Sequence, residues 1–552
     1  MQTASTETPP PTEPEGASEF QPLPGPELAF AVAGAVGTDL TRVCEVLQEQ
    51  LHEVGYSTAP KAIRLSERLR SFERFKNIPR TPADERTIAL MDAGDALRGA
   101  LKRGDAMSLL AIPAIRSERQ QITKDPKTPA QRHAYILHSL KRPDEVRTLR
   151  RIYGRAFHLI AAFSDRASRV SSLSARIAQT RHDFDYDSWR KTAEELVKRD
   201  EADLTKSLGQ DVRDTFPLAD VFVDATNRET MKNELGRYID LVFGHPFHTP
   251  TPDEFGMFHA RASALRSADL SRQVGAVISN SSGEIISVGF NDVPRPGGGH
   301  YWPGDERDAR DFVLGFDPSN RIKTEMLAEI LHILHRNGWL SEPHSHNDIE
   351  DLVENALMEG NDAILKDAQV MNILEFGRVV HAEMSAIAEA ARRGQSIHDA
   401  TLYCTTFPCH ICARHIIASG IARVVYIEPY PKSMAQRLYP EAIAVDDKYT
   451  VAEAVNFIPF LGISPHRYFD LFEMVGRRKD ERGSATKWKR ASARPRLERM
   501  VGSYLEIETL AIGAFEKGLE LSSFSLAETA GRGEEHDGEL AEGAVGVSPT
   551  RN

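Results

Sequence analysis

Short apolar runs and amphipathic stretches alternate along the first half of the chain. Leu28-Ala29-Phe30-Ala31-Val32 is an apolar run of strand length, and an amphipathic helix follows it through Leu51. The alternation continues with predicted strands at 134–140, 156–162 and 219–223 and predicted helices at 143–153, 189–207 and 227–242. Strands that alternate with helices form a largely parallel sheet with helices on both faces. The pattern therefore predicts an α/β domain over residues 28–245.

A stretch rich in proline and threonine, from His245 to Pro252, separates this domain from a second one. The second region opens near Glu254 with a predicted helix that carries Ala262, Leu265 and Leu270. A hairpin is expected from strands at 274–279 and 285–290 with its turn at 281–283, and a buried strand is expected at 423–427. We expect this second α/β domain to cover residues 254–475 and to contain a long insert at about 292–378.

The two ends of the chain differ from these domains in composition. Residues 1–27 are rich in proline, threonine and glutamate, which is typical of a disordered leader. Residues 476–552 begin with a basic segment between Arg477 and Arg499 that contains Trp488, and they end in an acidic, glycine-rich tail from about Ser522. An aromatic residue within a basic run suits RNA or single-stranded DNA, although a solvated terminal helix has the same composition.

Charge and cysteine content restrict the class of protein. The chain has 552 residues and a net charge of −12, which opposes a general nucleic-acid binder and favours a small substrate. Four cysteines, at 44, 404, 409 and 412, do not suggest a disulfide framework. The sequence has no apolar run of membrane-spanning length and no signal-like N-terminus, so we expect a cytoplasmic protein without a membrane partner.

Two short motifs carry the chemistry of the second domain. His381-Ala382-Glu383 is followed by Pro408-Cys409-His410-Ile411-Cys412. One imidazole and two thiolates supply three ligands for Zn²⁺ and leave a fourth tetrahedral position for water, as catalytic zinc sites do. Glu383 is not one of these ligands, so its carboxylate is free to take the proton from the water and to return it to the substrate. This set of residues is the signature of a hydrolytic nucleobase deaminase.

The helical context of the motifs agrees with this interpretation. Apolar residues follow His381 at helical spacing, which places Glu383 in a first turn, and a second helix is expected to open with Pro408 at its first position. A structural zinc knuckle would need a fourth protein ligand, and a redox Cys-x-x-Cys pair has no use for Glu383. Cys404 fits a buried strand position, and His410 and His415 fit packing or surface roles.

A glycine-containing turn follows the first predicted strand. Gly34, Gly37, Thr38 and Asp39 lie where a nucleotide-binding loop would be. The spacing departs from a working P-loop, because Thr38-Asp39 replaces Lys-Ser/Thr and an Asp that faces phosphates would repel them unless it caps the helix. Nucleotide sensing at this loop and a purely structural role both remain open. Asp92, Gly94, Asp95 and Arg98 form a polar patch, expected by default to be solvated surface.

The motifs from Ser267 to Tyr426 resemble the deoxycytidylate deaminase branch of the zinc-dependent cytidine deaminase superfamily. The match runs through 267–276, Gly289-Phe290-Asn291, 381–383 and 408–413 in the family's order. The layout is similar to bacterial anti-phage dCTP deaminases, to which Gly297-Gly298-Gly299-His300-Tyr301-Trp302, 428–433 and 459–462 also conform. That resemblance implies an N-terminal P-loop kinase-like parallel-sheet domain, then a three-layer α/β/α deaminase domain. It also implies conversion of deoxycytidine nucleotides to deoxyuridine nucleotides, which drains dCTP from an infected cell.

The resemblance assigns roles residue by residue. His381, Cys409 and Cys412 match the zinc ligands, and Glu383 matches the proton shuttle. Asn291 matches a nucleoside-contacting position, although an Asn after Gly-Phe is often only a turn residue. Arg272 is expected either to bind phosphate or to cap a helix. Lys432 and Ser433 are expected to cradle phosphate or to belong to an exposed loop.

Partners and rival functions follow from the same features. The resemblance implies a homo-oligomer and makes an inhibitory RNA conceivable, and the N-terminal domain allows a second nucleotide. Housekeeping dCMP deamination for thymidylate supply is the nearest rival to dCTP depletion, although it requires no large N-terminal domain. A cytidine deaminase acting on RNA or single-stranded DNA and a nucleotide-binding switch with an inert deaminase domain are further alternatives.

Overall fold

The computed structural model describes most of the chain outside its two ends. The described residues are 25–201, 203, 208–342, 344–357, 363–365, 368–373, 375–427, 433–445, 453–474, 476–496, 503–522 and 524. Most of the predicted leader and tail therefore lies outside the described residues. None of the helices in these ranges is both long enough and apolar enough to cross a membrane.

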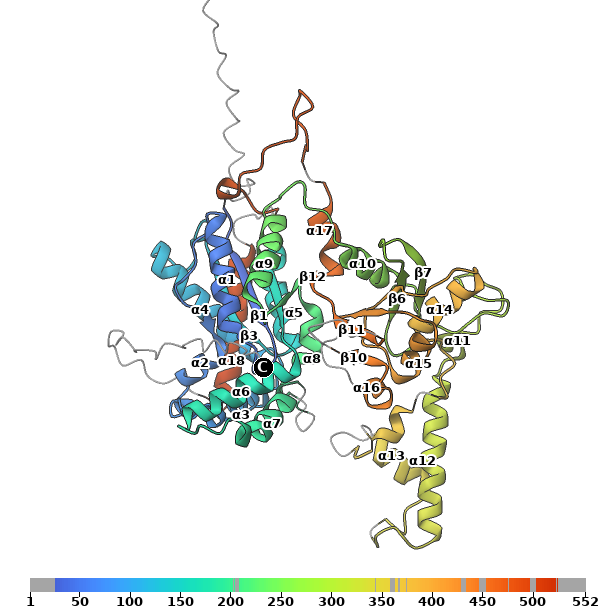
Figure 1. The fold of residues 1–552 in the computed structure, drawn as a ribbon. Coiled ribbons are helices and arrows are strands. Elements are labelled where there is room, and N and C mark those ends of the chain that lie inside the picture. The colour runs from blue at the N-terminus through green and yellow to red at the C-terminus, as the bar shows by residue number, and fades with distance from the viewer. Residues whose placement is uncertain are drawn as a thin grey trace, which may run out of the picture.

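The first unit is built on a six-stranded sheet of mostly parallel strands (Figure 1). Its strands, in spatial order, are β12 (Gly462–Ile463), β5 (Val221–Asp224), β4 (Phe157–Phe163), β1 (Leu28–Ala33), β3 (Ala134–Leu140) and β2 (Ile63–Arg64). All pairings are parallel except that of β12 with β5. The predicted strand at 134–140 and the predicted helix at 143–153 have the bounds of β3 and of α5 (Pro143–Tyr153).

Helices cover both faces of this sheet. Successive side chains of β1 point to opposite sides, and because all of them are apolar, both faces must be covered. Leu28, Phe30 and Val32 pack into a core with α1 (Leu40–Glu53) and α9 (Arg228–Val242). Ala29, Ala31 and Ala33 face the opposite core. The other helices of the unit are α2 (Leu65–Arg68), α3 (Ala83–Leu101), α4 (Ala106–Thr123), α5, α6 (Arg166–Thr180), α7 (Arg190–Glu201), α8 (Val212–Thr215) and α18 (Ser503–Glu520).

The second unit contains another six-stranded sheet, and α12 and α13 project from it in Figure 1. Its strands, in spatial order, are β10 (Ile443–Val445), β11 (Val455–Pro459), β9 (Arg423–Tyr426), β8 (Thr401–Cys404), β6 (Gly275–Ser279) and β7 (Ile285–Phe290). Its helices are α10 (Pro252–Ala264), α11 (Asp311–Leu314), α12 (Pro318–Arg336), α13 (Ile349–Leu357), α14 (Ala382–Arg392), α15 (His410–Ala418), α16 (Ala435–Leu438) and α17 (Tyr468–Phe472). The expected hairpin is β6 and β7.

Two glycines allow helices to lie directly on this sheet. A Cβ at Gly275 would lie 1.9 Å from the carbonyl oxygen of Ala260 in α10. A Cβ at Gly289 would lie 2.2 Å from the carbonyl oxygen of Ala382 in α14. Because α14 begins at Ala382, the glycine in β7 fixes the position of the residues around His381.

Two expectations about local structure were wrong. The helix from Glu254 does not reach Leu265 or Leu270, which are exposed, because the Asp269 carboxylate accepts hydrogen bonds from the Ser271 and Arg272 amides and forms a turn. Most of the polar patch in α3 is not solvated. Arg98 is buried and donates to Asp95 at 2.7 Å and to the carbonyl oxygen of Leu208 at 2.7 Å.

The predicted ends of the chain are partly ordered. Glu27, expected in the disordered leader, is buried and accepts hydrogen bonds from Arg119. Phe524, expected in the tail, is buried and packs edge-on against Phe72. The helix α18, which the apolar pattern did not reveal, packs on α4 of the first unit.

A buried carboxylate joins the two units next to β12. Asp220 accepts a hydrogen bond from the Leu159 amide at 2.6 Å and lies 2.7 Å from His466 and 3.4 Å from Arg467. Burial would raise the pKa of Asp220, but the His466 hydrogen bond and the charges of Arg467 and Arg150 outweigh it and hold that pKa well below its ordinary value.

Asp220→Asn is expected to destabilise the protein at neutral pH by about 3 kcal/mol, because it removes a buried carboxylate from the partly buried cations Arg150 and Arg467. A carboxyl whose pKa is depressed by folding stabilises above its unfolded pKa of about 4, and the contribution is lost as the pH falls below it. The difference in stability between wild type and variant should therefore be constant from neutral to mildly acidic pH, and it should become smaller at lower pH. Melting temperatures measured across this range, with Asp214→Asn as an exposed control, test it.

Candidate active site

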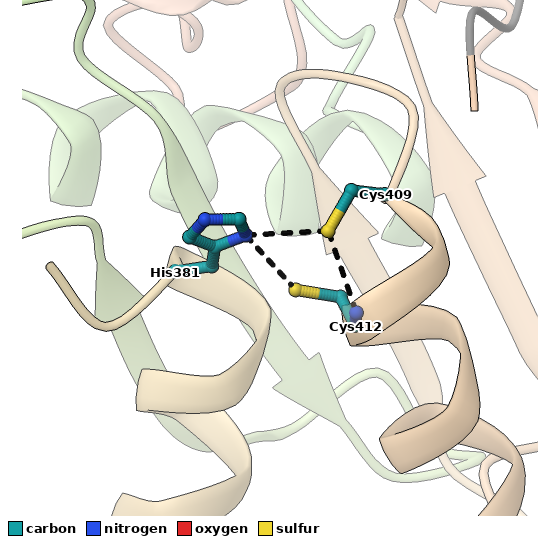
Figure 2. Close-up of side chains that lie close together, drawn as sticks. All are labelled: His381, Cys409 and Cys412. Carbon is teal, nitrogen blue, oxygen red and sulfur yellow. Dashed lines mark hydrogen bonds between the residues drawn. The ribbon is translucent and has the colours of Figure 1, made fainter. Parts of the chain in front are cut away.

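Two helix N-termini bring the predicted metal ligands together. His381 is the N-cap residue of α14, Cys409 is the N-cap residue of α15, and Cys412 lies in the first turn of α15. Figure 2 shows the three side chains pointing toward one another, with His381 Nδ1 at 3.3 Å from Cys409 Sγ and 3.4 Å from Cys412 Sγ. All three ligand atoms lie within 4.8 Å of one another. The fold thus brings the three predicted ligands together from two separate helix starts.

The start of α15 differs from the expected one. Pro408 is not the first helical residue, since the helix begins at His410 and Cys409 is its N-cap. The sulfur of Cys409 accepts a hydrogen bond from the Cys412 amide at 3.4 Å, which is the bond an N-cap side chain makes. Cys409 therefore serves the helix as well as the metal site.

The charges of the triad suit a metal that binds thiolates. The hydrogen bond from Cys412 lowers the pKa of Cys409, and the charge of His381 lowers it further, which favours a thiolate at Cys409. The same hydrogen bond raises the pKa of Cys412. Ordinary Zn–S and Zn–N bond lengths in a tetrahedral site place sulfur and nitrogen ligands about 3.5 Å apart. The observed separations are close to this value, so the residues fit Zn²⁺.

Glu383 lies beside the triad without belonging to it. It is the second residue of α14, its side chain is buried, and it is not one of the three grouped ligands. Burial raises the pKa of Glu383, and the negative charge of Cys409 adds to this effect. A buried carboxyl with a raised pKa next to a metal site suits a group that takes up and releases protons.

Cys412→Ala is expected to lose bound zinc, because two ligands hold the metal far more weakly than three. Cys404→Ala is the matched control, since Cys404 is a fully buried thiol at the end of β8 that is not part of the triad. Zinc per chain, measured by mass spectrometry after purification, should fall well below one equivalent only in the Cys412 variant. Equal zinc in both variants would remove Cys412 from the ligand set.

Cys404, His410 and His415 lie near the triad in the sequence but are not part of it. Cys404 is in the core, and burial raises its pKa well above the ordinary value of a thiol. His410 and His415 lie on α15, and neither belongs to the described metal-ligand group.

Asn291 holds the segment that carries Arg272. Its side-chain oxygen accepts a hydrogen bond from the Val274 amide at 2.6 Å, and its side-chain nitrogen donates to the carbonyl oxygen of Arg272 at 2.8 Å. Arg272 is exposed and caps none of the described helices. The hydrogen bond with Cys409 raises the pKa of His381, and the positive charge of Arg272 opposes this rise.

The proposed phosphate loop near Ser433 is only partly described. Lys432 lies outside the described residues. The Ser433 hydroxyl accepts a hydrogen bond from the Ala435 amide at 3.0 Å, at the start of α16.

The glycine-containing turn of the first unit is bonded to an internal carboxylate. The Val36 amide donates to Asp200 at 2.7 Å, and Lys141 contacts Asp200 and the carbonyl oxygen of Gly34, each at 2.9 Å. The Asp39 carboxylate accepts a hydrogen bond from the Arg42 amide and so caps α1, which is the alternative to facing a phosphate. Gly37 has φ +94°, and a Cβ there would lie 2.4 Å from the Arg169 carbonyl oxygen. These contacts support a structural role for Gly34, Gly37 and Asp39.

Sequence reasoning missed an aromatic and cationic cluster at the end of β7. The Arg266 guanidinium carbon lies 3.3 Å from the ring centroid of Trp302 and 4.5 Å from that of Phe290. His300 packs against Phe290 with ring centroids 4.4 Å apart. The Gly-Gly-Gly-His-Tyr-Trp motif pointed to this loop, but Arg266 follows a helix end and has no local signal.

Comparison with known proteins covers the second unit. Residues 250–428 match a family model described as the cytidine and deoxycytidylate deaminase zinc-binding region. The deoxycytidylate deaminase of Enterobacteria phage T2 is 30% identical over 165 residues, which are 29% of this chain and 71% of the phage protein. The probable deoxycytidylate deaminase of Drosophila melanogaster is 26% identical over 230 residues, 40% of this chain and 85% of the fly protein.

Among solved structures, the apo dCMP deaminase of cyanophage S-TIM5 is similar over 39% of this chain and 100% of its own length, at 16% sequence identity. The TM-score of this comparison is 0.20.

Proposed function

The chain belongs to the cytidine and deoxycytidylate deaminase family, and from that premise we propose that it hydrolyses the amino group of a deoxycytidine nucleotide. The products are ammonia and the matching deoxyuridine nucleotide. The observation that carries the proposal is the triad of His381, Cys409 and Cys412 with the buried Glu383 carboxyl beside it. Family membership implies Zn²⁺ as the cofactor.

Glu383 provides the proton transfers of this reaction. Zinc bound by the triad would supply a hydroxide at neutral pH to attack C4 of the cytosine ring. Glu383 takes the proton that the attacking water gives up and passes it to ring N3. It then moves the proton of the hydroxyl group now bonded to C4 to the amino nitrogen, so that the C4–N bond breaks and ammonia leaves. Water and cytosine are thereby converted to uracil and ammonia without a net change in protons.

Arg272 and Asn291 are the proposed nucleotide contacts. The Arg272 guanidinium is exposed and its charge acts on His381, so it can bind the phosphate of the substrate through charge-assisted hydrogen bonds. Asn291 uses its side chain to hold the backbone that carries Arg272, and its amide retains hydrogen-bonding capacity for the sugar. Ser433 is a weaker candidate, because its hydroxyl already accepts a hydrogen bond from Ala435.

We propose dCTP as the substrate and depletion of dCTP during phage infection as the role. The support is the resemblance of the whole layout to anti-phage dCTP deaminases and the presence of a sheet domain outside the matched residues 250–428. The deoxycytidylate deaminases among the relatives favour a second candidate, deamination of dCMP for thymidylate precursor supply.

An ammonia-release assay on zinc-loaded protein separates these candidates. It compares dCTP, dCMP, CTP, deoxycytidine and a cytosine-containing single strand. We expect dCTP to have the highest kcat/KM. A preference for dCMP would favour the precursor-supply role, and activity on the strand alone would contradict both.

The defence role is tested separately in cells. Expression of the wild-type chain should lower both the dCTP pool and the plaque count after phage infection, and Glu383→Ala should do neither. Protection that persists in this variant would show that defence does not depend on deamination.

A further inference from the structure

A cavity of about 310 Å³ lies outside the deaminase site. It is open to solvent on one side and is lined by the linker after α9, the end of α17, residues 476–478 and 486–488, and Arg496. We call it the basic cavity and define it by His245, His248, Arg478, Lys487, Trp488 and Arg496. None of these residues belongs to the metal triad.

Positive charge collects in the basic cavity without matching acids. Arg477, Arg478, Lys487 and Arg496 line it, and Glu473 is the one acidic residue in its lining. Within the described residues, Arg477, Arg478 and Lys487 have no carboxylate partner, and the Nε atom of Arg478 is buried without a hydrogen-bond partner. In a chain of net charge −12, such a group of unpaired cations is a place where an anion would be stabilised.

Arg496 reinforces this positive field. Its guanidinium donates to the carbonyl oxygens of Leu471 and Glu473, which fixes it at the cavity wall. Burial lowers the pKa of Arg496, repulsion from Arg478 lowers it further, and the charges of Glu473 and Asp470 only partly oppose this. Two guanidinium groups close enough to repel each other would both gain from an anion placed between them.

The other wall of the basic cavity is aromatic. The rings of His245 and His248 have centroids 4.0 Å apart, and the Trp488 ring lies 4.7 Å from His245. Trp488 is fixed in place, since its indole nitrogen donates to the carbonyl oxygen of Phe243 at 3.2 Å. The His245 and Trp488 rings meet edge-on at 69°, and an exposed ring face beside a group of cations is complementary to a ligand with a planar base and a phosphate chain.

We propose that the basic cavity binds a nucleoside di- or triphosphate. Its phosphates would contact Arg478, Lys487 and Arg496, and its base would stack on the ring of either His245 or Trp488, which lie edge-on to each other. The volume is at the lower end of the range for small-molecule pockets, which suits one nucleotide and not a folded nucleic acid. This is a second ligand site, and it does not depend on which deoxycytidine nucleotide is deaminated.

Equilibrium dialysis of the full chain with radiolabelled ATP tests the proposal. ATP is expected to bind, with affinity falling at higher salt because the contacts are ionic. Arg478→Ala and Lys487→Glu should each weaken binding about tenfold or more, since each removes a charge-assisted contact. Arg482→Ala is the matched control, because Arg482 is an exposed cation of the same segment that does not line the cavity. Unchanged melting temperatures would show that the variants are folded.

Several results would overturn the proposal. These are absence of ATP binding to the wild type at millimolar concentration, unaltered binding in both cavity variants, or an equal loss in Arg482→Ala. Adenosine binding as tightly as ATP would remove the phosphate role. Binding of a single-stranded oligonucleotide, with no binding of ATP, would show that the ligand is a polynucleotide.

Discussion

Glu383→Ala is expected to lower the rate of deamination by about 10²- to 10⁴-fold, the usual contribution of a positioned general acid–base. Glu383 is buried beside the triad but does not belong to it, so the variant should keep its zinc. The loss should appear mainly in kcat, because the carboxyl acts on protons that move during the reaction. Ammonia release and zinc content, measured on the same preparation, test both parts of this expectation.

The control for this variant is a second glutamate of the same helix. Glu389 lies near the C-terminal end of α14, where it pairs with Arg392 at 2.8 Å, and it is not part of the metal-ligand group. Glu389→Ala should therefore leave both activity and zinc unchanged. Glu383→Gln keeps the shape of the side chain and removes its proton transfer, and it should be as inactive as the alanine variant. Full activity in Glu383→Ala would contradict the proposed mechanism, and loss of zinc would mean that the carboxylate is a ligand.

The centre of the site was predictable because its signals are local. His381 with Glu383, and Cys409 with Cys412, are each set by spacing within one helix start, and few other functions need those residues together. The strand β3 and the helix α5 were predictable for a similar reason, since their apolar periodicity is unbroken and flanked by polar residues. The distance between the two halves of the triad came only from the fold.

Features that depend on distant partners were not predictable. Arg98 is buried because it meets Asp95 and the Leu208 carbonyl, and a mid-helix arginine gives no local sign of this. Proline suits the first position of a helix, so the sequence predicts Pro408 there. In the structure Cys409 is the N-cap instead, through its sulfur. The helix α10 ends earlier than the apolar pattern predicts, and Asp269 forms a turn in the segment that follows it.

A buried arginine explains why the C-terminal helix α18 belongs to the first unit. Arg119 of α4 is fully buried and donates to Glu27 at 2.8 Å and to Glu508 of α18 at 2.8 Å. Tyr504 of α18 also donates to Glu27, at 2.8 Å. One cation therefore joins Glu27, the helix α4 and the helix α18. The acidic and apolar residues of α18 could not show this, because the partner lies 389 positions earlier.

Arg119→Ala is expected to destabilise the protein by about 3–5 kcal/mol or more, because it leaves two buried carboxylates facing each other without a cation. Arg119 holds the pKa of Glu27 below its ordinary value although burial raises it, so in the variant the carboxyls would bind protons more readily. The stability gap between wild type and variant should therefore narrow as the pH falls toward the carboxyl range. Arg116→Ala, one turn earlier on α4, is the control and should melt like the wild type. If the Arg119 variant also melts like the wild type, with α18 equally resistant to protease, then the apolar contacts of Phe515 and Leu519 hold the helix without this ion cluster.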